Sequence, residues 1–119
     1  SWIEQLCEAM ESKETIMIWK KTAERAAVEF KVSYGNAMKT IMAMLEKFRK
    51  DMDFEKRQEF VYSFFPFMFG IYPYTVVTKK QKEAMKLAGV DYTYSSLYNL
   101  TFVALEGCLG IKKVISKTK

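Results

Sequence analysis

Residues 23–48 read AERAAVEFKVSYGNAMKTIMAMLEKF, and this stretch decides the fold class. Its apolar side chains recur at alternating steps of three and four, with lysines and glutamates between them. Such spacing draws one apolar stripe along a helix of about 3.6 residues per turn. We predict one long amphipathic helix, or two that meet near Ser33-Tyr34-Gly35. The stripe consists of Ala23, Ala27, Phe30, Tyr34, Ala37, Ile41, Leu45 and Phe48.

Two shorter helices are predicted before this stretch. Residues 2–11 carry Ile3, Leu6, Cys7 and Met10 at helical spacing, which makes one buried face. Ser12 is a suitable N-cap for a second helix, because its hydroxyl can accept from a free backbone N–H of the first turn. In that helix we expect Ile16 and Trp19 to point into the core.

After residue 50 the pattern changes to a helix that is apolar on all sides. Asp53 is predicted to cap it, and from Phe60 to Tyr72 only Ser63, Pro66 and Gly70 are not hydrophobic. Such a helix needs cover on several sides. Pro66 removes one backbone hydrogen bond and is expected to kink it. The sequence Tyr72-Pro73-Tyr74 is expected to end it.

Two more helices complete the prediction. Thr78 and Gln81 form a capping-box pattern, and Gly89 stands where a helix would end. We expect Asp91 to open the last helix, whose stripe is Tyr94, Leu97, Thr101, Leu105 and Cys108, with the small residues Ala104, Gly107 and Gly110 nearby. The prediction is an all-α, orthogonal or antiparallel bundle of five to six helices, a single domain over residues 1–119.

The composition excludes the enzyme classes that depend on histidine. The chain has no histidine, which excludes histidine triads and histidine zinc sites. We find no glycine-rich phosphate loop, no metal-ligand spacing and no nucleophile beside a base. We therefore predict no catalytic residues, no metal and no cofactor. The two cysteines, Cys7 and Cys108, lie among apolar residues and are expected to be buried reduced thiols.

The net charge of +5 is concentrated at one end. Four lysines lie in the last eight residues, namely Lys112, Lys113, Lys117 and Lys119, and the rest of the chain has 15 basic and 14 acidic residues. A short basic tail on a balanced body is usually a solvated terminus. Direct binding of nucleic acid is therefore not expected.

We also do not expect the chain to span a membrane. Residues 60–78 carry no charge, which is long enough to span, but Tyr72-Pro73-Tyr74 interrupts the apolar helix after 13 residues. The chain starts Ser1-Trp2-Ile3-Glu4-Gln5, which does not resemble a signal peptide. We expect a soluble cytoplasmic protein with no membrane partner.

The apolar helix has two open interpretations. In one, Pro66 and Gly70 open space for a ligand, walled by Phe64, Phe65, Phe67, Met68 and Tyr72, because Met and Phe suit an adaptable apolar pocket. In the other, the same side chains are plain core, as apolar stripes at helical spacing usually are.

Several short segments resemble the C-terminal regulatory half of TetR-type transcriptional regulators. They are Ala27-Val28-Glu29-Phe30-Lys31, residues 64–74 (FFPFMFGIYPY), residues 78–85 (TKKQKEAM), residues 88–90 (AGV) and residues 105–109 (LEGCL). The resemblance covers about residues 24 to 111. The family's DNA-reading helix-turn-helix precedes this half and is absent from this chain.

This resemblance implies a homodimer that pairs through its last two long helices, which match Glu55–Tyr72 and Tyr92–Ile111 here. It also implies a cavity for a small effector, apolar or aromatic, between those helices and the preceding ones. Ligand binding would shift helices and change the spacing of two DNA-reading heads, which is allostery by differential affinity. DNA would be bound only through the missing N-terminal domain.

The candidate site residues follow from this reading. The candidate ligand-binding residues are Trp19, Phe30, Tyr34, Met38, Met42, Phe64, Phe65, Met68 and Tyr72. The candidate dimer-interface residues are Phe60, Phe67, Ile71, Leu97, Thr101, Ala104, Leu105 and Cys108. The alternatives are a helical protein-interaction module without a ligand and, less favoured, a membrane-associated helical protein.

Overall fold

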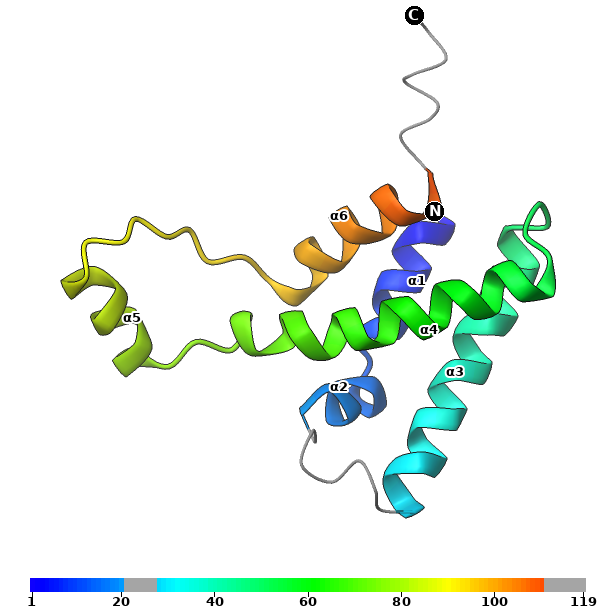
Figure 1. Ribbon diagram of the computed structural model, residues 1–119, viewed down its shortest axis with the longest axis horizontal. Coiled ribbons are helices and arrows are strands. Elements are labelled where there is room, and N and C mark those ends of the chain that lie inside the picture. Colours follow the sequence, from blue (N-terminus) through cyan, green and yellow to red (C-terminus); the bar gives the residue numbers. More distant parts are fainter. Residues whose placement is uncertain (21–27, 111–119) are drawn as a thin grey trace, which may run out of the picture.

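The computed structural model describes residues 1–20 and 28–110, and the predicted all-α class is confirmed. No strand occurs in these residues. The elements, drawn in Figure 1, are α1 (Trp2–Met10), α2 (Lys13–Lys20), α3 (Val28–Phe48), α4 (Phe54–Ile71), the 3-10 turn η2 (Tyr72–Tyr74), α5 (Lys79–Leu87) and α6 (Leu97–Leu109).

The first two helices form as their sequence predicts. Ile3, Leu6, Cys7 and Met10 of α1 are all buried. The hydroxyl of Ser12 accepts a hydrogen bond of 3.2 Å from the backbone N–H of Thr15, which confirms it as the cap of α2. In α2 Trp19 is buried and Ile16 is half-buried against the core.

Helix α3 runs through Gly35 without a break, so the single-helix alternative is correct for residues 28–48. Phe30, Ala37, Ile41 and Leu45 are buried along one stripe, and Tyr34 and Phe48 lie half-buried beside it. The predicted members Ala23 and Ala27 lie outside the described residues.

Helix α4 begins at its predicted cap, because the Asp53 carboxylate accepts a hydrogen bond of 2.8 Å from the Lys56 amide. It continues through Pro66 to Ile71. The predicted cover on several sides of this helix is not found within the chain. One face of α4 is buried, whereas Tyr62 and Phe67 on the rest of its surface are exposed. The buried face consists of Phe60, Val61, Phe64, Phe65 and Met68.

Residues 75–96 form an arm that projects from the bundle, with α5 at its far end (Figure 1), whereas η2 still packs on α2 and α4. Helix α5 lies at 78° to the helical segment Phe54–Tyr74. Both predicted ends of α5 are present, since Thr78 and Gln81 form the capping box and Gly89 adopts φ 74° just past the helix. No residue of α5 is buried, although its sequence is amphipathic.

The predicted start of the last helix is wrong. Helix α6 begins at Leu97, where the Ser96 hydroxyl accepts a hydrogen bond of 3.0 Å from the Asn99 amide, and Asp91 lies in the arm. The intervening Tyr92, Thr93 and Tyr94 are aromatic or β-branched and favour helix weakly. Consequently Tyr94 is not part of the α6 stripe, and Ile111 lies outside the described residues.

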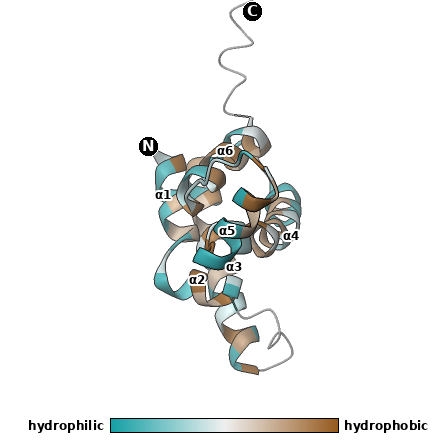
Figure 2. Cartoon of the chain, turned by 90° about the vertical axis from the view of Figure 1, so that its left-hand side faces the viewer, coloured by the Kyte–Doolittle hydropathy of each residue, from teal (hydrophilic) through white to brown (hydrophobic). Residues whose placement is uncertain are grey.

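The helices bury one continuous core. Helix α1 packs on α6 and α3, while α4 packs on α2, α3 and α6. Figure 2 shows hydrophobic residues on the surfaces that these helices turn toward one another. At the end of α6, Leu109 is buried and Cys108 is exposed, so the predicted burial of Cys108 is wrong. The buried stripe of α6 continues from Leu105 to Leu109, which is one helical turn later, and Cys108 lies outside this stripe.

Candidate functional site

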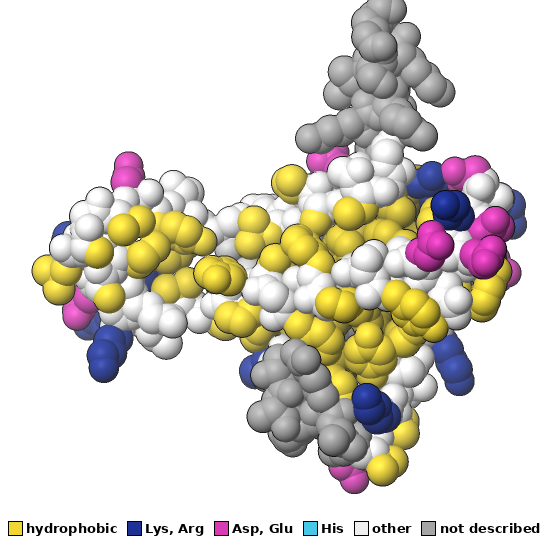
Figure 3. Space-filling model, in the orientation of Figure 1, with side chains coloured by type: hydrophobic (Ala, Val, Ile, Leu, Met, Phe, Trp, Pro, Cys, Tyr) yellow, Lys and Arg dark blue, Asp and Glu magenta, His cyan; other side chains and the backbone are white. Residues whose placement is uncertain are grey.

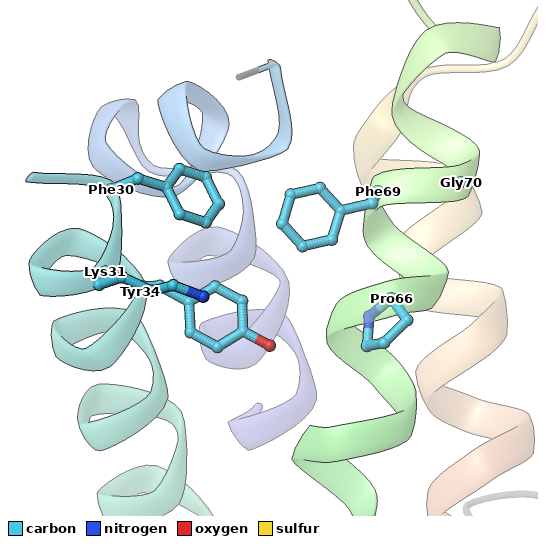
Figure 4. Close-up of a pocket in the computed structure, with 6 residues that line it drawn as sticks. All are labelled: Phe30, Lys31, Tyr34, Pro66, Phe69 and Gly70. Atoms are coloured by element: carbon cyan, nitrogen blue, oxygen red, sulfur yellow. The ribbon is translucent and has the colours of Figure 1, made fainter. Parts of the chain in front are cut away.

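A groove lies between α3 and α4, with a volume of ≈ 520 Å³. Its described walls are Phe30, Lys31 and Tyr34 of α3 and Pro66, Phe69 and Gly70 of α4. Figure 4 shows the Phe30 and Tyr34 rings projecting from α3 toward Phe69 on α4. Phe30, Tyr34 and Phe69 give this wall three aromatic rings, and Lys31 is its charged member among the described residues.

Phe69 is the centre of an aromatic cluster behind this groove. Its ring centroid lies 5.3 Å from that of Trp19, 6.2 Å from Phe30 and 6.3 Å from Tyr34. The Tyr34 ring is stacked on Phe69 with 8° between the planes. Contacts of this kind add about 0.5–1.5 kcal/mol each beyond the area they bury.

The same cluster extends into the core through Phe65. Its ring meets Trp19 edge to face at 5.2 Å and Tyr34 at 5.4 Å. Trp19 is held in place because its indole N–H donates a hydrogen bond of 2.8 Å to the Met10 carbonyl. One side of the groove is therefore fixed by the packed core.

This arrangement follows from helical spacing in the two helices. Phe30 and Tyr34 are four residues apart on α3, and Phe65 and Phe69 are four apart on α4. Side chains at that spacing lie one above the other on the same face. The packing of α3 against α4 brings the two aromatic pairs together.

The candidate ligand-binding residues fall into three groups. Phe30 and Tyr34 line the groove. Met38 and Met42 line a second hollow of ≈ 540 Å³ between α3 and the start of α4, with Phe54 and Arg57. The other five, which are buried and packed against one another in the core, are Trp19, Phe64, Phe65, Met68 and Tyr72.

The candidate interface residues divide in a similar way. Phe67 and Cys108 are exposed, and Ile71 and Ala104 are half-buried. The remaining four, Phe60, Leu97, Thr101 and Leu105, are buried inside their own chain. They lie on the sides by which α4 and α6 join the bundle, whereas the uncovered surface of the two helices includes Tyr62, Phe67 and Val103.

Two residues that line the groove, Lys31 and Phe69, were not among the ligand-binding residues predicted from the sequence. Phe69 could have been found from its position four residues after Phe65, since an aromatic pair at that spacing shares one face. Lys31 gave no such signal, because it belongs to the charged positions beside the α3 stripe and one more lysine there is ordinary.

Among the described residues, the most strongly perturbed titrating group is the Cys7 thiol, whose pKa rises to about 11. Burial is the main cause, and the carboxylates of Glu11, Glu4, Glu8 and Glu106 add to it. A thiol held neutral in this way is not a nucleophile. Cys7 therefore acts as a core residue.

Among the described residues, neither a metal-binding cluster nor a single membrane-spanning helix is present. No group of three or more Cys, Asp or Glu side chains could hold a metal ion there. No single helix in this part of the chain is long and apolar enough to cross a membrane. The segment Phe54–Tyr74 together with α5 has the length and composition of a span, but the two are bent by 78° relative to each other.

Comparison with known proteins adds no relative: no family model, no curated protein and no solved structure matches the chain significantly. These comparisons therefore assign no family to the chain.

Proposed function

We propose that the chain is the effector-sensing and dimerisation domain of a TetR-type transcriptional regulator. The effector is small and largely apolar or aromatic, and it occupies the groove between α3 and α4. The domain acts on DNA through an N-terminal domain that is not part of this sequence. We place this function in the cytoplasm.

One observation supports the proposal above all: α4 carries both surfaces that such a domain needs. Phe69, Pro66 and Gly70 line the groove, while Phe67 on the same two turns is exposed where a partner could cover it. A ligand that moves this part of α4 would move the partner surface with it. The coupling would equal the difference in ligand affinity between the two positions of α4.

The walls also suggest the chemistry of the effector. Aromatic rings on both walls, with the Lys31 ammonium on the α3 wall beside Phe30 and Tyr34, fit a molecule with a flat apolar body and an anionic group. Six of the nine candidate ligand residues are buried core, and of these six Phe30 also lines the groove. We therefore assign ligand contact to Phe30, Lys31, Tyr34 and Phe69.

Native mass spectrometry of the chain, purified without detergent, tests this function. We expect a dimer and a small-molecule adduct that organic extraction removes. Phe69→Ala should abolish the adduct. Phe54→Ala, a truncation of an exposed phenylalanine on the same helix, should retain it. A monomer without adduct, or an adduct of equal occupancy in both variants, would refute the proposal.

A second candidate function is a helical interaction module without a ligand, favoured by the complete packing of Trp19, Phe65 and Met68. Such a module would form a complex but show no adduct and no ligand-dependent rise in melting temperature. A membrane-associated protein, the third candidate, would require detergent to stay in solution.

A further inference from the structure

The second hollow, lined by Met38 and Met42, lies beside the effector groove on the same pair of helices. The lining of the groove on α3 ends at Tyr34, and the lining of the second hollow begins at the next residue, Gly35, and continues to Glu46. Figure 3 shows hydrophobic side chains gathered in the angle between α4 and α3. Because the two spaces adjoin along one helix, a single elongated ligand can occupy both.

A row of side chains on α3 joins the two spaces. Tyr34, Met38 and Met42 are four residues apart, so they follow one another on the same face of the helix. Tyr34 lines the groove, whereas Met38 and Met42 line the second hollow, and all three are half-buried. Methionine is unbranched and adapts to an irregular apolar ligand.

Helix α4 provides a matching row on the other side. Gln58 lines the second hollow and Pro66 lines the groove. Tyr62 lies between them, four residues from each, and its side chain is 55% exposed. A ligand that extends from one space to the other would therefore pass the Tyr62 ring.

The two spaces differ in the charge that they offer. The groove presents the Lys31 ammonium among aromatic rings. The charged residues described in the second hollow are Lys39, Glu46 and Arg57. Arg57 lies 3.9 Å from Glu46 and also donates to the Met52 carbonyl. Because these contacts engage Arg57, and Lys39 and Glu46 are exposed with opposite signs, the second hollow mainly offers the apolar surface of its methionines and Phe54.

We propose that the effector is an aromatic acid with an alkyl tail. The aromatic acid occupies the groove beside Lys31, and the tail runs past Tyr62 along Met38 and Met42. Lys31 and Met42 are 11 positions apart (42 minus 31), which is about 16 Å along a helix that rises 1.5 Å per residue. This inference rests on the proposed function, and it adds the tail and its binding site to the effector.

A homologous series of ligands tests the tail site. The probes are benzoate and its para-butyl, para-hexyl and para-octyl derivatives, each titrated into the full chain by isothermal titration calorimetry. We expect Kd to fall at least about twofold for each added CH2 group, since a fully buried CH2 gives about fourfold. Lys31→Met should weaken every member by a similar factor, because the acid group is common to the series.

Substitutions in the second hollow should act on the tail alone. A chain with Met38→Gln and Met42→Gln keeps the side-chain length and the helix propensity but makes the row polar. It should flatten the dependence on chain length and leave the Kd of benzoate within about twofold, because benzoate has no tail to lose buried CH2 groups. Ala43→Glu is a second variant at an exposed position of the same hollow, where folding does not depend on the side chain, and it should weaken the para-octyl derivative more than benzoate.

Met44→Gln is the matched control. Met44 is half-buried on the same helix but lines neither space, so this chain should keep the full dependence on chain length.

The outcomes separate the tail site from the proposed function. A Kd that does not change with chain length overturns the tail site, while the adduct and its loss in Phe69→Ala still decide the effector groove. A dependence that is equal in the unaltered chain, the double variant and Met44→Gln places the tail elsewhere and also overturns the inference. If no member of the series binds, the aromatic acid with a tail is wrong, and the adduct test alone decides the function.

Discussion

The guanidinium of Arg49 donates a hydrogen bond of 2.6 Å to the backbone carbonyl of Leu109, 60 positions along the chain. The same side chain holds Asp51 through two further bonds of 2.8 Å and 2.7 Å. It therefore joins the turn after α3 to the last carbonyls of α6, which have no partner within their own helix. A cation also suits the negative end of a helix.

Arg49→Met should lower the free energy of unfolding by about 1.5–3 kcal/mol, the usual contribution of a hydrogen bond to a charged group. Urea unfolding at pH 7 measures this change. Lys50→Met, which removes an exposed charge at the next position, should stay within about 0.5 kcal/mol. Equal losses in the two variants would show that the bond to Leu109 contributes nothing.

Phe67→Lys should dissociate the proposed dimer and leave the monomer folded. The Phe67 side chain is 39% exposed on α4, so the new ammonium reaches water in the monomer and is buried only against a partner. Sedimentation velocity and the melting temperature at low protein concentration measure the two effects. Leu105→Lys is the contrasting variant, since Leu105 is 0% exposed and a lysine there should unfold the chain. A Phe67→Lys chain that remains a dimer would place the interface elsewhere.

The two thiols should differ sharply in reactivity. Cys108 is exposed and should react with an aromatic disulfide reagent at pH 8 within minutes, whereas buried Cys7 should react only after unfolding. The amount of chromophore released without urea gives the number of reactive thiols in the folded protein, and the amount released in urea gives the number in the unfolded protein. Two thiols reacting at once in the folded protein would contradict the burial of Cys7.

The raised pKa of Cys7 predicts a pH dependence of stability. Because the folded state holds the thiol proton more tightly, this contribution is complete below pH 9.0 and is lost as the pH rises to about 11. Urea midpoints between pH 8 and pH 11 should therefore fall more steeply for the unaltered chain than for Cys7→Ala. Parallel slopes would show that Cys7 does not titrate with a shifted pKa.

Gly89→Ala should melt α5 and leave the bundle intact. Gly89 has φ 74°, and its amide and that of Val90 bond to the carbonyls of Lys86 and Met85, at 3.1 Å and 3.0 Å. A Cβ in this left-handed conformation costs about 1–2 kcal/mol. Hydrogen exchange should speed up across α5 but not in α1 or α3. A fall in the global melting temperature would mean that the arm packs on the bundle.

Much of the fold could be predicted because helix ends are local chemistry. Ser12, Asp53, Thr78 and Gly89 act within one turn of their own position, and each terminates or begins a helix where its sequence indicates. The buried face of α1 follows equally well from its own spacing. The start of α6 was missed because Asp91 and Ser96 are both good caps, and the weak helix propensity of the residues between them decides in favour of Ser96.

The candidate site was less predictable because it depends on which helices meet. Periodicity finds an apolar face but does not say whether the face meets a ligand or another helix. Phe65 and Phe69 have the same spacing signal, yet Phe65 is fully buried and Phe69 lines the groove. The exposure of Phe67 and of most of α5 likewise depends on tertiary packing.

The contact between Trp19 and Phe69 gives the chain its own optical reporter. The buried indole touches the ring that forms the groove wall, while the other tryptophan, Trp2, stacks on Phe48 at the other end of α3. In a Trp2→Phe chain the fluorescence therefore comes from one indole beside the groove. A molecule that enters and shifts Phe69 changes the emission without any added dye, so effectors can be screened by light alone.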